Sequence, residues 1–271
     1  MSDIIRIALV QMMVSDDKTE NLRNAEKMTR KAVQKGAQIV ILPEMFVCPY
    51  ETRKCIANKE KAGETIWKAL SRIASENRVY LVGGSFPEED GEKLYNTCFV
   101  FDDSGNEIAR HRKAHLFDVD IKGGQYYKES SVFAPGDDIC IFEAFGHKFG
   151  VAICFDIRFP EYFMKLTLEG AEAVIVPASF NMTTGPMHWE LSFRMRAVDN
   201  QIYTAGTAPA RNEAGKYVSY ANSIVCDPWG KKIADGGTDE NIITADLDMD
   251  IVRSAREQLP ILNARREELY R

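Results

Sequence analysis

The sequence has no long apolar run, no excess of positive charge and no paired cysteine motif. No stretch approaches the ~18–20 apolar residues that a membrane-spanning helix requires. The first residues lack a basic segment followed by an apolar core, so we expect no signal peptide. Lys and Arg number 34 against 40 for Asp and Glu, and this balance offers no general attraction for nucleic acid or anionic lipid. We therefore expect a cytoplasmic protein that binds neither nucleic acid nor membranes.

The six cysteines show no Cys-x-x-Cys spacing, and most of them lie within apolar segments. This pattern indicates reduced thiols rather than a disulfide framework. Neither the cysteines nor the histidines have a spacing typical of metal ligands, so the sequence predicts no metal and no other cofactor. The cysteines are Cys48, Cys55, Cys98, Cys140, Cys154 and Cys226.

The order of the expected elements predicts a mixed α/β fold with two stacked sheets and outer helices. A strand over residues 4–11, a helix over 21–35 and a strand over 38–42 form a strand–helix–strand unit. No Pro/Gly-rich linker appears, so we expect a single domain over residues 1–271. Later segments predict helices over 65–77 and 158–169, strands over 78–83 and 173–176, and hairpins that pair 95–101 with 107–111, 139–142 with 148–154, and 217–226 with 231–234.

Residues 187–198 fit two kinds of element. Apolar residues fall at every second position from 187 to 195, which is typical of a strand. Gly185 and Pro186 before the segment, and the charged residues within it, favour a helix. We expect a helix, with Trp189, Phe193 and Met195 in the core or in a dimer contact.

A cysteine, a glutamate and a lysine each stand where a strand-like segment ends. Residues 148–154 form an apolar run that turns polar after Cys154, as a nucleophile does at a strand–turn–helix elbow. By itself a cysteine at such a place is more often packed in a core. Two further segments end in the same way, at Glu44 and at Lys113. The combination indicates a site built from a carboxylate, an ammonium and a thiol.

These three groups suit attack on an amide. A thiol has a pKa near 8.5 and needs a base, and Glu44 can serve if burial raises its own pKa. Pro43 ends the strand and places Glu44 in a loop. Lys113 and the backbone N–H of Phe155 would stabilise the tetrahedral oxyanion. The products would be ammonia and an acid, released through a thioester.

Three motifs carry a resemblance over the whole chain: Leu-Pro-Glu at 42–44, His-Arg-Lys at 111–113, and Gly-Val-Ala-Ile-Cys-Phe-Asp-Ile-Arg-Phe-Pro-Glu at 150–161. Together they resemble the nitrilase superfamily of carbon–nitrogen hydrolases, whose members use a Glu-Lys-Cys triad. The resemblance implies a four-layer αββα sandwich and a homodimer or higher homo-oligomer. It makes Cys154 the nucleophile, Glu44 the base and Lys113 the oxyanion stabiliser. Many members carry a second glutamate, matched here by Glu129, which would orient Lys113 or share the base work.

A finer resemblance points to the omega-amidase branch. It rests on segments 94–97, 113–120, 179–190 and 196–200, and it implies hydrolysis of the terminal amide of small dicarboxylate monoamides such as 2-oxoglutaramate. Such a substrate carries a second carboxylate, which needs a cation or several donors in the pocket. Candidate substrate-binding residues are Tyr50, Phe117, Phe155, Arg158 and Thr183, the last in a loop before an expected helix N-terminus.

Other interpretations stay open at this stage. Within the superfamily, the alternatives are a deaminated-glutathione amidase, an N-carbamoyl hydrolase and a true nitrilase. A papain-like pairing of Cys154 with His115 is disfavoured, because the Gln or Asn context of that family is absent near Cys154. For Arg158, the alternative to substrate binding is a structural ion pair with Asp156 or Glu161. From another class, the chain would be a catalytically silent scaffold or binding protein, which an intact triad argues against.

Overall fold

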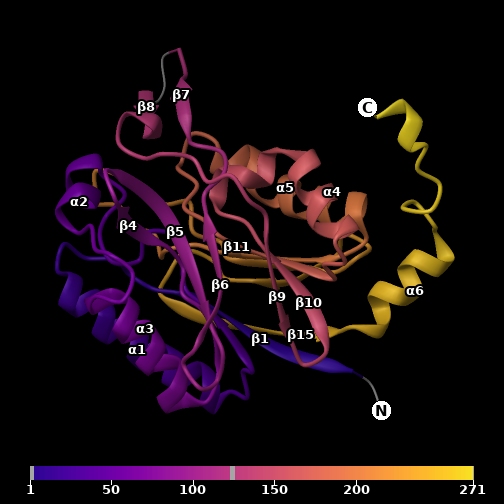
Figure 1. Ribbon diagram of the computed structural model, residues 1–271, viewed down its shortest axis with the longest axis horizontal. Helices are drawn as coiled ribbons and strands as arrows, with labels where there is room; N and C mark the ends of the chain where they lie inside the picture. The colour runs from indigo at the N-terminus through magenta and orange to yellow at the C-terminus, as the bar shows by residue number, and fades with distance from the viewer. Residues whose placement is uncertain (1–2, 123–125, 271) are drawn as a thin grey trace.

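The protein has two stacked sheets with helices on their outer faces (Figure 1). The structure is a computed structural model and describes residues 3–122 and 126–270. The first sheet has the order β15-β1-β2-β3-β5-β4, with β6 also paired to β5, and the second has the order β14-β13-β12-β11-β10-β9. The first comprises β1 (Ile4–Gln11), β2 (Ile39–Ile41), β3 (Tyr80–Val82), β4 (Phe86–Asp90), β5 (Lys93–Phe101), β6 (Glu107–Arg112) and β15 (Asn241–Asp248), and the second β9 (Cys140–Ala144), β10 (His147–Val151), β11 (Ala173–Pro177), β12 (Tyr203–Thr207), β13 (Ile224–Cys226) and β14 (Lys232–Asp235).

Helices cover the outer face of each sheet, which gives the four layers of an αββα sandwich (Figure 1). One outer layer contains α1 (Lys18–Gln34) and α3 (Thr65–Asn77), and the other contains α4 (Pro160–Leu168) and α5 (Gly185–Asn200). The remaining elements are α2 (Thr52–Ala57), α6 (Asp250–Gln258), the short pair β7 (Asp118–Asp120) and β8 (Tyr126–Lys128), and three 3-10 turns, η1 (Glu129–Ser131), η2 (Cys154–Arg158) and η3 (Glu267–Leu269). The expected fold class is confirmed.

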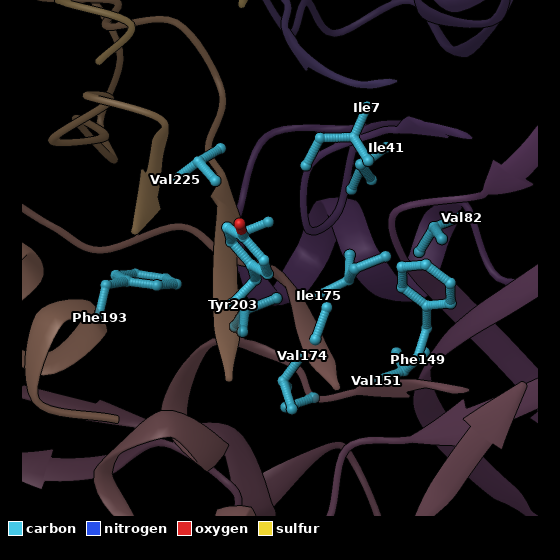
Figure 2. Packing of buried hydrophobic residues seen from close by; sticks show 14 of the residues in the cluster. Ile7, Ile41, Val82, Phe149, Val151, Val174, Ile175, Phe193, Tyr203 and Val225 are labelled. Carbon is cyan, nitrogen blue, oxygen red and sulfur yellow. The ribbon is translucent and has the colours of Figure 1, made fainter. Parts of the chain in front are cut away.

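Alternation along β1 explains why the sheets stack. Ile7 and Leu9 point into the core between the sheets, whereas Ala8 and Val10 point into the core beneath α1 and α3. Successive side chains of a strand face opposite sides of its sheet, so an apolar residue at every position requires cover on both faces. Figure 2 shows the inter-sheet core, where Ile7 and Ile41 of the first sheet lie near Ile175 and Tyr203 of the second.

The structure confirms the helix expected over 187–198, which spans Gly185–Asn200 as α5. Trp189 and Phe193 are buried in the core, and Met195 is exposed. Two expected strands are too long. β10 ends at Val151, so Cys154 lies beyond the strand, and the strand expected over 217–226 is formed only by β13. After β10 the chain leaves the sheet before the apolar run ends, and before β13 it joins the sheet only at Ile224.

Among residues 3–122 and 126–270, no helix combines the length and apolar character that crossing a bilayer requires.

Candidate active site

The loop that carries Glu44 leaves β2 and turns sharply. Met45 has a φ of 52°, a left-handed conformation that few residues other than glycine adopt. Gly84 lies against this loop, and a Cβ there would stand 2.2 Å from the Pro43 carbonyl oxygen. The Ser85 hydroxyl accepts a hydrogen bond from the Met45 N–H at 3.1 Å. Close packing and one hydrogen bond therefore fix the place where Glu44 enters the interior.

Cys154 is the first residue of η2, and Ala152 and Ile153 separate it from Val151, the last residue of β10. Its φ of 45° is again left-handed, and strain of this kind persists only where the surroundings enforce it. The Asp156 carboxylate accepts a hydrogen bond from the Ile153 N–H at 2.9 Å, and the Asp156 N–H donates to the Ile153 carbonyl at 3.0 Å. This reciprocal pair closes the turn around Cys154 and supports its conformation.

Asp156 also ties the cysteine turn to the end of β6. His111 Nε2 lies 2.9 Å from one carboxylate oxygen, and His115 Nδ1 lies 2.8 Å from the other. Burial alone would raise the pKa of Asp156, but the hydrogen bonds to His111 and His115 hold this pKa well below its ordinary value. His115 also stacks on Phe159, with ring centroids 3.7 Å apart. Its ring is therefore engaged with Asp156 and Phe159, which disfavours a Cys-His pairing.

Lys113 follows β6 directly and lies between the two glutamates predicted from the sequence. Its Nζ is 2.9 Å from Glu44 Oε1 and 2.9 Å from Glu129 Oε2. All three side chains are fully buried. One ammonium is therefore the partner of two buried carboxylates, and removal of Lys113 would leave both of them without a counter-ion.

Glu129 accepts more hydrogen bonds than Glu44 does. Tyr50 Oη donates to Glu129 Oε1 at 2.8 Å, and the Phe117 N–H donates to Oε2 at 2.6 Å. Asn96 Nδ2 and Lys113 Nζ each lie 3.2 Å from Oε1. Both oxygens of Glu129 are thus occupied by donors, and these contacts fix the position of its carboxylate.

The Cys154 thiol lies beside the Glu44 carboxylate. Burial raises the pKa of Glu44, and the neighbouring Glu129 raises it further. Burial and the charge of Glu44 likewise raise the pKa of Cys154 well above its ordinary value. Burial alone would lower the pKa of Lys113, but both carboxylates outweigh burial and raise it. The resting cluster therefore holds a neutral thiol beside a carboxylate whose affinity for a proton is increased.

Two cavities meet beside this cluster. The smaller measures about 10 Å³, and the larger, lined in part by Glu44, measures about 460 Å³. The smaller has room for roughly one water molecule. It brings together Cys154 and four of the five predicted substrate-binding residues, Tyr50, Phe117, Phe155 and Arg158. Thr183 does not line it, and the neighbouring Thr184 does.

Arg158 is a half-buried cation without an acidic partner among the described residues. Its Nη1 lies 3.0 Å from His188 Nδ1, and its guanidinium lies over Phe180, 4.9 Å from the ring centroid. Its Nε is buried and has no hydrogen-bond partner in the described part of the chain. Burial lowers the pKa of Arg158. The structural bridge to Asp156 or Glu161 is not formed.

Several residues of the site were missed by sequence reasoning. Ser179 and Tyr217 line both cavities, and Phe180 lines the smaller one. Asn96 contacts both glutamates. A motif signal existed for Asn96 and Ser179, which lie in segments used for the finer resemblance. Tyr217 had no such signal, because it reads as the first residue of an apolar strand.

Sequence comparison gives relatives over nearly the whole chain. The profile of the family described as carbon-nitrogen hydrolase matches residues 6–257. The omega-amidase NIT2 of Xenopus tropicalis is 47% identical, over 98% of this chain and 96% of that protein. The omega-amidase NIT2 of Homo sapiens is 42% identical with the same coverage.

Solved structures agree with the sequence relatives. Nit3 of Saccharomyces cerevisiae, a member of branch 10 of the nitrilase superfamily, superimposes with a TM-score of 0.89 at 39% identity, over 97% of each chain. An amidase from Nesterenkonia sp. superimposes with a TM-score of 0.81 at 27% identity, over 99% of this chain and 96% of that one. The active-site cysteine of that amidase carries the acetamide moiety of fluoroacetamide.

Proposed function

This chain belongs to the carbon–nitrogen hydrolase family, the nitrilase superfamily, and from that premise we propose how its buried cluster hydrolyses amides. It is a cysteine-dependent amidase. The proposed substrates are small dicarboxylate monoamides such as 2-oxoglutaramate, because relatives at 42–47% identity over nearly the full length are omega-amidases. The proposed nucleophile is Cys154, with Glu44 as general base and Lys113 as oxyanion stabiliser.

The mechanism begins from a neutral thiol and an ionised Glu44. As Cys154 Sγ attacks the amide carbon, its proton passes to Glu44, whose raised pKa favours the transfer. The carbonyl oxygen becomes an oxyanion, for which Lys113 Nζ and the Phe155 N–H are the proposed donors. Glu44 then returns the proton to the leaving nitrogen, the C–N bond breaks, and ammonia departs. Water then attacks the thioester carbon with Glu44 as base, the C–S bond breaks, and Glu44 returns the proton to Cys154 Sγ as the acid departs.

Glu129 is proposed to position Lys113 rather than to act as a base. Four donors already occupy its two oxygens, from Tyr50, Asn96, Lys113 and Phe117. A base needs an oxygen free to receive a proton, and Glu44 has one, because Oε2 accepts no hydrogen bond within residues 3–122 and 126–270. The two glutamates therefore differ in role because they differ in how many donors reach them.

Specificity for a second carboxylate is proposed to come from Arg158. One observation supports dicarboxylate monoamides as the substrates. The guanidinium of Arg158 lies half-buried on the wall of the Cys154 cavity and pairs with no described carboxylate. A cation in this state loses hydration without an ion pair in return, and a ligand carboxylate would supply that pair. Arg presents a planar set of donors suited to bidentate carboxylate binding.

Release of ammonia from 2-oxoglutaramate tests this function. Glutamine, a carbamoyl-β-amino acid and an aliphatic nitrile are assayed beside it, with wild type compared with Cys154→Ala. We expect turnover of the oxo-monoamide alone, abolished in the variant because sulfur supplies the covalent step. Turnover of the carbamoyl compound or the nitrile instead would refute the omega-amidase branch. Activity that survives in Cys154→Ala would refute the cysteine mechanism.

A homodimer in the cytoplasm is also proposed. On α5 the exposed residues Met187, Leu191 and Met195 recur at every fourth position and form one apolar stripe. The six cysteines are unpaired thiols, which favours a reducing compartment. Sedimentation of the purified chain measures the number of subunits, and a monomer at micromolar concentration would contradict the dimer.

A further inference from the structure

Asn96 contacts the two glutamates of the active site from β5. Its Nδ2 donates to Glu44 Oε1 at 2.9 Å and lies 3.2 Å from Glu129 Oε1. Its backbone carbonyl accepts a hydrogen bond from the Lys113 N–H at 2.8 Å. The side chain is fully buried. One residue of β5 is therefore linked to all three charged members of the cluster.

The orientation of the Asn96 amide is determined by its neighbours. The opposite orientation would place Oδ1 against the oxygens of Glu44 and Glu129, where acceptor faces acceptor. In the orientation found, Oδ1 is buried without a partner in the described part of the chain. An unpaired buried carbonyl is unfavourable, so the two bonds from Nδ2 are the contacts that favour an amide at this position.

Asn96 makes the two oxygens of Glu44 unequal. Oε1 accepts from Asn96 Nδ2 and from Lys113 Nζ, both at 2.9 Å, while Oε2 accepts from no described residue. The Cys154 thiol lies beside the same carboxylate. We propose that Asn96 is a positioning residue that occupies Oε1 of Glu44 and leaves Oε2 to receive the proton of Cys154. This inference rests on the proposed function, in which Glu44 is the base.

Loss of the Asn96 amide has a predictable electrostatic effect. A hydrogen bond donated to a carboxylate favours its charged form, so removal of the donor raises the pKa of Glu44 further. The carboxylate would then become protonated at a higher pH and cease to act as a base there. The titratable groups that act on the charge of Glu44 are Lys113, Glu129 and Cys154. Glu44 in turn raises the pKa of Tyr50, Tyr217 and Cys55.

The experiment measures alkylation of Cys154 by iodoacetamide across pH, together with kcat and KM for 2-oxoglutaramate. Asn96→Leu keeps the volume of the side chain and removes its donors, and Asn96→Ala removes the donors and leaves a cavity. Asn200→Leu is the matched control, because Asn200 is equally buried but bonds to Thr167 and to the Arg196 carbonyl. Circular dichroism and Tm are recorded for every variant.

The acid limb is the part of the pH profile where the alkylation rate of Cys154 falls as pH decreases. We expect this limb to move to higher pH by about one unit in both Asn96 variants and to stay in place in the control. Turnover should fall roughly tenfold or more in kcat, with little change in KM. A limb at the wild-type position in a folded Asn96 variant would overturn the inference, even if Tm falls. Absence of ammonia release would refute the proposed substrate instead, and the alkylation limbs would still decide the role of Asn96.

Discussion

Replacement of Arg158 by methionine tests whether this guanidinium recognises the second carboxylate of the substrate. Methionine keeps most of the length of the side chain and its contact with Phe180, which lies 4.9 Å from the guanidinium in the wild type. The perturbation therefore removes charge and donors while largely preserving the packing. His188 loses its partner at Nδ1.

The magnitude follows from the environment of Arg158. A hydrogen bond between a charged donor and a carboxylate contributes about 1.5–3 kcal/mol. One factor of ten in rate corresponds to about 1.4 kcal/mol. Since the guanidinium is half-buried and has no acidic partner among the described residues, no internal ion pair has to break before it binds a ligand. The loss in kcat/KM should then be about 10- to 100-fold for a substrate that carries the carboxylate.

The assay uses two amides of equal chain length. Succinamate carries a carboxylate where butyramide carries a methyl group, so the ratio of their kcat/KM values isolates recognition of the carboxylate. We expect Arg158→Met to lower this ratio by about 10- to 100-fold and to leave butyramide hydrolysis nearly unchanged. Arg194→Met is the matched control, because the side chain of Arg194 is 53% exposed and pairs with Glu190.

Two results would refute the reasoning. An equal loss for succinamate and butyramide would mean that Arg158 supports the turn after Cys154 rather than the substrate. Wild-type kcat/KM values for both amides would mean that other donors in the cavity hold the carboxylate.

Two further predictions concern buried and half-buried charge. Lys113→Met should lower kcat by about 10²–10³ through loss of an oxyanion donor, and it should lower Tm by on the order of 10 °C, because two buried carboxylates lose their counter-ion. A change confined to KM would make Lys113 a substrate-binding group instead. At the surface, burial alone would lower the pKa of His147, but hydrogen bonds to Asp3 and Glu172 outweigh burial and raise it. The resulting stability is complete below the unfolded pKa near 6.5 and is lost as pH rises through the folded value. The Tm difference between wild type and His147→Gln should therefore shrink from about pH 5.5 to 8.5, and a constant difference would contradict this.

Local patterns predicted most of the elements. The bounds of β1 and α3 agree with the expected residues, because an apolar period and a terminating residue are encoded within a few positions. The segment 187–198 was ambiguous by period, and Gly185 and Pro186 correctly favoured a helix. The strand expected over 217–226 was wrong in its first part, where Tyr217 and Ser219 line a cavity and the strand begins only at Ile224.

The sequence by itself determined the chemical types at the site and their order along the chain, since Glu44, Lys113 and Cys154 stand in motifs of a few residues. Only the tertiary structure decided which of these groups meet. Lys113 meets a carboxylate 69 residues away, and Asn96 meets Glu44 across 52 residues. No local pattern contains such a distance. Which oxygen of which glutamate stays free depends on the donors that the two stacked sheets and their loops bring together, and therefore on the fold.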